Sequence, residues 1–243
     1  IDAPAGSIEL KLAAAGQNLG FGYLPEQALW LADTARLSTA GALRSTPAPA
    51  GLRRGDVLDG GSVRLIAERG FVVQQAGSVV DVSGAAAVLD LPTGPLGSPQ
   101  AATVASAAGS VRIEAAEGAL LDGELRAMPG GANAGGGRFD LDLTLANRSE
   151  IVPSPTPAQR VVELAAGVGS FVPAGLAYGD AVQRSAPDDL TGIARLDPAQ
   201  LAAGGFDFIT VGADQAIRLG SDLRLGATAG VELTAPVLGL AGY

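Results

Sequence analysis

The sequence predicts an all-β protein, more specifically a parallel β-helix, a solenoid in which each coil takes up about 20 residues. Short strands with alternating apolar and polar side chains, the period of a half-buried strand, recur in the same order at 60–84, 109–128 and 215–234. Aromatic residues make up only 4% of the 243 residues, while Gly contributes 35. This composition suits stacked aliphatic side chains better than a sandwich core, which relies on large aromatic residues.

The first repeat illustrates how the strands are assigned. Apolar and polar residues alternate over 62–67, a turn at 68–70 precedes an apolar run at 71–73, and a third strand follows Gly77. One coil cannot bury its inward face alone, so stability must come from neighbouring coils. The residues that we expect to face inward are Val63, Leu65, Val80, Val82, Val111, Ile113, Leu125, Ile217, Leu219, Leu223 and Leu225.

The chain is expected to divide into three parts. Residues 1–145 form coils, with loop excursions near 45–59 and 92–100, where Pro and Gly accumulate. Residues 146–204 lose the strand rhythm and are interpreted as an insertion, and residues 205–243 resume the coils.

The insertion is expected to lie outside the solenoid, because the three prolines within 153–157 cannot take part in a strand ladder. It contains strand-like pieces near 160–164 and 193–196 and one helix, 198–203, with Asp197 as its N-cap and Gly204 ending it. Its apolar residues are too numerous to remain in water. We therefore expect it to pack on a flank of the solenoid and to carry a partner-binding surface, since binding concentrates on loops held by a rigid scaffold.

Charge and residue usage limit the functions that the chain can have. The net charge is -9 and the isoelectric point is near 4.5, which opposes binding to nucleic acid or to anionic lipid. The chain has no Cys and no His, the residues that most often bind transition metals. No apolar stretch approaches the ~20 residues that a membrane helix needs, so no membrane span is expected.

Three segments carry a resemblance to a known family. They are Gly-Ser-Val-Val-Asp-Val-Ser-Gly at 77–84, Ala-Gly-Ser-Val-Arg-Ile at 108–113 with Leu-Leu-Asp-Gly at 120–123, and Leu-Ala-Ala-Gly-Gly-Phe-Asp at 201–207. In these segments the chain resembles the large filamentous haemagglutinin exoproteins of Gram-negative bacteria. The resemblance implies a right-handed β-helix fibre outside the cell, exported by two-partner secretion through an outer-membrane transporter.

The same resemblance implies a role in adhesion, contact-dependent competition or biofilm cohesion. Neither the secretion domain nor the toxin domain of such proteins is recognisable, so the chain resembles a piece of the shaft. We expect both ends to continue into further coils of a longer parent, which also leaves end-to-end or lateral self-association open. The partners would be the secretion transporter and a surface receptor on a host or bacterial cell.

Arg54-Gly55-Asp56 is the candidate binding motif. It is an integrin-type tripeptide in a loop that we expect to be exposed. The alternative interpretation is a simple turn before Val57, because short motifs arise readily by chance.

A polysaccharide-active β-helix enzyme of the pectate-lyase type is the alternative function. Asp140 and Asp142 are expected to share an outward face beside Arg138, and such enzymes use outward carboxylates to hold Ca²⁺ and an arginine as base. Outward charges are also what any exposed strand presents. We therefore predict no catalytic activity, no metal site and no cofactor.

Overall fold

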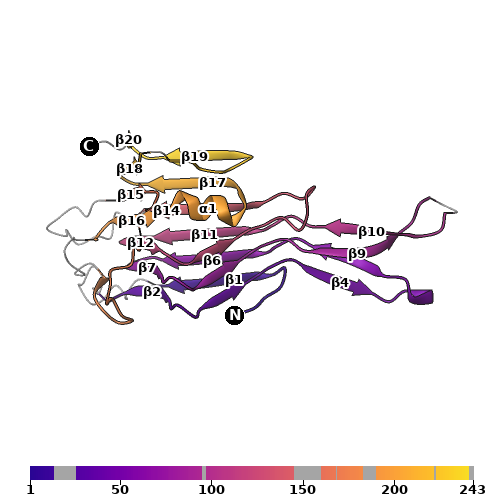
Figure 1. The fold of residues 1–243 in the computed structure, drawn as a ribbon. Helices are drawn as coiled ribbons and strands as arrows, with labels where there is room; N and C mark the ends of the chain where they lie inside the picture. Colours follow the sequence, from indigo (N-terminus) through magenta and orange to yellow (C-terminus); the bar gives the residue numbers. More distant parts are fainter. Residues whose placement is uncertain are drawn as a thin grey trace.

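The computed structural model describes residues 1–13, 26–94, 97–144, 160–167, 169–182, 190–221 and 223–240. Within these residues the protein consists almost entirely of strands, with one α-helix and one short 3-10 helix (Figure 1). The expectation of an all-β protein is confirmed.

Three parallel sheets form the body of the described chain. The six-stranded sheet has the order β1 (Ser7–Leu12), β6 (Ser62–Ala67), β11 (Ser110–Ala115), β14 (Gly137–Leu143), β17 (Phe206–Ala213) and β19 (Gly230–Thr234). The seven-stranded sheet has the order β2 (Ala28–Leu31), β7 (Phe71–Gln74), β12 (Gly118–Leu121), β16 (Ile193–Leu196), β15 (Val161–Leu164), β18 (Ala216–Leu219) and β20 (Val237–Leu240). The three-stranded sheet has the order β13 (Glu124–Arg126), β8 (Val79–Asp81) and β3 (Arg36–Ser38).

Three strands that follow one another in the chain can lie in three different sheets. β6, β7 and β8 lie in the three parallel sheets in turn. β11, β12 and β13, later in the chain, lie one to one beside them, parallel and in register. Close contact between these neighbouring segments explains why residue 109 is a glycine. A Cβ on Gly109, at the start of β11, would lie 1.8 Å from the carbonyl oxygen of Gly61 in the previous repeat.

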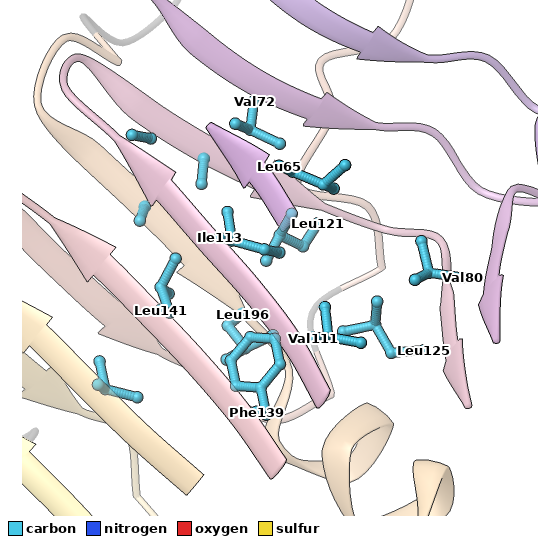
Figure 2. Packing of buried hydrophobic residues seen from close by; sticks show 14 of the residues in the cluster. Leu65, Val72, Val80, Val111, Ile113, Leu121, Leu125, Phe139, Leu141 and Leu196 are labelled. Atoms are coloured by element: carbon cyan, nitrogen blue, oxygen red, sulfur yellow. The ribbon is translucent and has the colours of Figure 1, made fainter. Parts of the chain in front are cut away.

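The core lies between the sheets, where inward side chains of successive strands stack on one another (Figure 2). Eight of the eleven residues predicted to face inward are at most 1% exposed, which confirms the prediction for Val63, Leu65, Val80, Val82, Val111, Ile113, Leu125 and Ile217. Leu219, Leu223 and Leu225 are only partly buried. They lie near the last strands of the described chain, where Val237 and Leu238 are 58% and 55% exposed.

The strand expected around Leu223 and Leu225 does not form. This part of the chain runs beside the helix α1 (Pro198–Gly204), and a Cβ on Gly226 would lie 2.9 Å from that of Ala202. A helix uses its backbone groups internally, so it offers no ladder to a neighbouring strand. The two leucines still pack against the core from an irregular segment.

The excursion expected near 45–59 belongs to an antiparallel hairpin, and the described residues of the one expected near 92–100 lie between the strands of a second hairpin, apart from Gln100. β4 (Ala42–Thr46) pairs with β5 (Arg54–Leu58), and β9 (Ala86–Leu91) pairs with β10 (Gln100–Ala105). The 3-10 helix Pro49–Gly51 lies at the tip of the first hairpin. Both hairpins extend away from the stacked sheets (Figure 1).

The insertion expected at 146–204 is not wholly outside the sheets. β15 and β16 join the seven-stranded sheet, because each strand places two apolar side chains in the core. These are Val162 and Leu164 in β15, and Ala194 and Leu196 in β16. Residues 145–159, with the three prolines, lie outside the described residues.

The expected helix is present as α1. The Asp197 carboxylate accepts a hydrogen bond of 2.8 Å from the backbone N–H of Ala199, and Gly205, with φ of 82°, ends the helix one residue later than expected.

Candidate functional site: the hairpins and the covered flank

Polar contacts fasten the two hairpins to each other at their bases. The hydroxyl of Ser106 accepts a hydrogen bond from the N–H of Ala85 and donates one to the carbonyl oxygen of Leu58, both 2.9 Å long. The Asp59 carboxylate accepts a further one from the N–H of Ala107 at 2.9 Å. Each hairpin therefore starts from a fixed position on the stacked sheets.

A second set of contacts joins the hairpins further out. The Asp90 carboxylate accepts hydrogen bonds from the backbone N–H of Arg53 at 2.7 Å and from its guanidinium at 2.9 Å. The Arg53 guanidinium holds the pKa of Asp90 below its usual value. Leu89, next to Asp90, is only 4% exposed. The hairpins thus present one connected surface.

Arg54, Gly55 and Asp56 lie in strand β5, so the prediction that they occupy a loop is wrong. Gly55 pairs with Ser45 of β4, and a Cβ on this glycine would lie 2.3 Å from the carbonyl oxygen of Arg44. This close approach leaves no room for a side chain, which explains the glycine at this position. The Asp56 carboxylate is 2.8 Å from the Arg44 guanidinium, and both side chains are more than half exposed.

The strand geometry determines what this motif can present. Residues two apart in a strand point to the same face, so Arg54 and Asp56 share one face of the hairpin. Arg54 is exposed, whereas Asp56 already has a cationic partner. The chemistry available here is a guanidinium suited to an acidic group, beside an ion pair that a partner would have to open.

The residues considered for lyase chemistry lie on the outer face of the six-stranded sheet. The Arg138 guanidinium is 2.8 Å from the Asp140 carboxylate, donates to the hydroxyl of Thr210 at 3.0 Å, and lies 4.5 Å from the ring centroid of Phe208. Burial raises the pKa of Asp142. In the described part of the chain, no group of three or more His, Cys, Asp or Glu could hold a metal ion.

A second apolar cluster covers the outer face of the seven-stranded sheet. Phe71, Val73 and Leu120 point outward from β7 and β12 and are fully buried beneath residues that follow β15, which are Phe171, Val182 and Leu190. The Asp122 carboxylate fixes this cover, because it accepts hydrogen bonds from the N–H groups of Phe171 and Val172 at 2.7 and 2.9 Å.

The cover also carries exposed features that the sequence did not single out. Tyr178 is 82% exposed and meets Trp30 of β2 edge-on, with 6.4 Å between the ring centroids. A hollow of about 340 Å³ lies beside Phe171 of the cover and is lined in part by Asp122, Glu124 and Gln200. Strand alternation gives no signal for these residues, because they come together only when the cover is in place.

Glu117 is a buried carboxylate that joins distant parts of the chain. It is 1% exposed, and it lies 2.9 Å from the Arg69 guanidinium and 3.6 Å from that of Arg160. It also accepts a hydrogen bond from the N–H of Gly70. Burial raises its pKa, although both arginines act in the opposite direction.

None of the helices in the described ranges is long and apolar enough to cross a membrane. No protein-family model matches the chain, and neither the curated proteins nor the solved structures yield a match to it.

Proposed function

We propose that this chain is a shaft segment of a secreted bacterial surface fibre, a right-handed parallel β-helix that carries adhesive projections. The observation that supports the proposal is the repeated parallel register. For example, Ile8, Val63, Val111, Phe139, Ile209 and Val231 follow one another across the six-stranded sheet. A stack of this kind can be lengthened by adding repeats, because each repeat contacts only its neighbours.

The projections are the parts of this shaft proposed to contact partners. Arg54 is exposed on strand β5 of one hairpin, and Tyr178 of the cover is 82% exposed. In proteins with a rigid scaffold, binding residues are concentrated on the segments that project from the scaffold. The partners proposed are a receptor on a host or bacterial cell and, during export, an outer-membrane two-partner secretion transporter.

A cell-attachment assay tests the adhesive role. Surfaces coated with the purified chain are offered to epithelial cells and, separately, to Gram-negative bacteria. We expect attachment of one of these cell types, and a reduction when Arg54→Ala and Tyr178→Ala are combined. Arg36→Ala, on the three-stranded sheet, is the matched control. No attachment of either cell type to the intact chain would contradict the adhesive role.

The lyase alternative has a separate test. Arg138 already engages Asp140, Thr210 and the ring of Phe208, so its guanidinium is poorly placed to act as a base. Incubation with pectin or alginate in the presence of Ca²⁺ should give no increase in the absorbance of unsaturated products. Steady product formation that Arg138→Ala abolishes would favour the enzyme.

A further inference from the structure

The strands of the seven-stranded sheet are out of chain order at one place. In the six-stranded sheet the strands follow one another as they do in the sequence. In the seven-stranded sheet β16 lies between β12 and β15, although β15 comes before β16 in the chain. All three of these strands are parallel.

β16 also accounts for the difference in strand number between the six-stranded and the seven-stranded sheet. Without it, each strand of the six-stranded sheet would be followed in the chain by one strand of the other sheet, at the same position in the stack. These pairs are β1 and β2, β6 and β7, β11 and β12, β14 and β15, β17 and β18, and β19 and β20. β16 is therefore one strand in excess of a regular stack.

β15 and β16 match each other residue by residue. Val161 lies beside Ile193, Val162 beside Ala194, and Leu164 beside Leu196. Ala194 in turn lies beside Ala119 of β12. If β15 took the place of β16, it would pair with β12 in the same register and keep its apolar residues inward.

The residues in front of these strands are compatible with the same exchange. The N–H of Gly192 donates to the carbonyl oxygen of Glu117, and the N–H of Val161 donates to that of Gly192. Across this glycine, the Arg160 guanidinium is 3.6 Å from the Glu117 carboxylate. The start of β15 is thus already in contact with the residue that precedes β12.

We infer that residues 165–196 form one insert, whose last strand, β16, is intercalated into a stack that is complete without it. When the insert is removed, β15 occupies the position of β16 on β12. Leu164 then leads directly into Asp197 and α1, as Leu196 does in the intact chain. This inference concerns the architecture and holds whether or not the chain is adhesive.

Cysteine pairs test the inference, because the chain has no Cys of its own. A disulfide needs Cα atoms about 4.4–6.8 Å apart, and neighbouring strands are about 4.8 Å apart. In the intact chain, Ala119→Cys with Ala194→Cys should form a disulfide under mild oxidation. Ala119→Cys with Val162→Cys should not, because these residues are two strands apart, about 9.6 Å. Both pairs face inward and differ only in the second strand.

In the variant that lacks residues 165–196, the pair Ala119→Cys and Val162→Cys should form the disulfide, as seen by peptide mapping without reduction. The deletion uncovers Val73 and Leu120, so it is also made with Val73→Thr and Leu120→Thr to keep the protein soluble. A folded deletion variant with both introduced thiols free would overturn the inference. The inference would also be overturned if neither deletion variant showed cooperative unfolding in urea, because it requires the remaining stack to fold without the insert.

Discussion

Leu141 offers the clearest test of the stacked core. It is 1% exposed and lies in register between Ile113 of β11 and Val211 of β17 (Figure 2). Leu141→Ala removes the burial of most of a leucine side chain, about 1.5–3 kcal/mol, and leaves a cavity. Because strand ladders hold the backbone on both sides of β14, the site cannot collapse to fill it. We therefore expect a loss in the upper part of the usual range, about 3–5 kcal/mol.

Urea unfolding followed by circular dichroism measures this loss, which should appear as a lower midpoint with an unchanged m-value. Leu43→Ala is the matched control, because Leu43 lies on a projecting hairpin and is 46% exposed, and it should cost less than about 0.5 kcal/mol. Leu219→Ala should fall between the two, since Leu219 is only partly buried. If Leu141→Ala costs no more than Leu43→Ala, the inward stack does not hold the protein together.

Three further expectations follow from single contacts. Gly109→Ala should destabilise strongly in urea, because its Cβ would lie 1.8 Å from the carbonyl oxygen of Gly61. Gly169→Ala has nothing within 4 Å and should be nearly neutral; equal effects would contradict this. Burial raises the pKa of Asp142, so the folded state loses stability as the pH rises from the unfolded pKa through the raised value, and the loss is complete above it. Asp142→Asn should then raise the urea midpoint at pH 7 but have little effect at pH 3, below the unfolded pKa of about 3.9; an equal gain at both would refute the cause. Asp122→Ala should release the cover and speed proteolysis within 169–182. Asp33→Ala, an exposed aspartate outside the cover, is the control; unchanged cleavage would count against the anchor.

Local alternation predicted the parts of the fold that depend on one strand at a time. It identified the inward side of β6, β8, β11 and β13, because a strand's period of two determines which residues share a face. Capping residues, Asp197 and the proline that follows it, located α1. Alternation had no part in that prediction. It failed around Leu225, where the neighbour in space is a helix and no ladder is available.

The remaining features depend on which segment lies beside which, and alternation does not specify neighbours. The Pro- and Gly-rich residues around Arg54 resemble a loop until β4 supplies a partner. Likewise, nothing in Val161–Leu164 or Ile193–Leu196 indicates that the later strand lies between β12 and the earlier one. The ion pairs of Glu117 and the contacts of Asp122 join residues that are far apart in the chain, and for the same reason they could not be predicted.

The distance across the whole six-stranded sheet tests the parallel stack most directly. Glu9 of β1 and Glu232 of β19 lie in the same row, five strand spacings apart, through Arg64, Arg112, Asp140 and Thr210. Nitroxide labels on Glu9→Cys and Glu232→Cys should give one narrow distance near 24 Å by pulsed electron spin resonance. Labels on Glu9→Cys and Thr210→Cys should give a distance shorter by one spacing, about 4.8 Å. A broad distribution, or two distances that do not differ by one spacing, would contradict the stack.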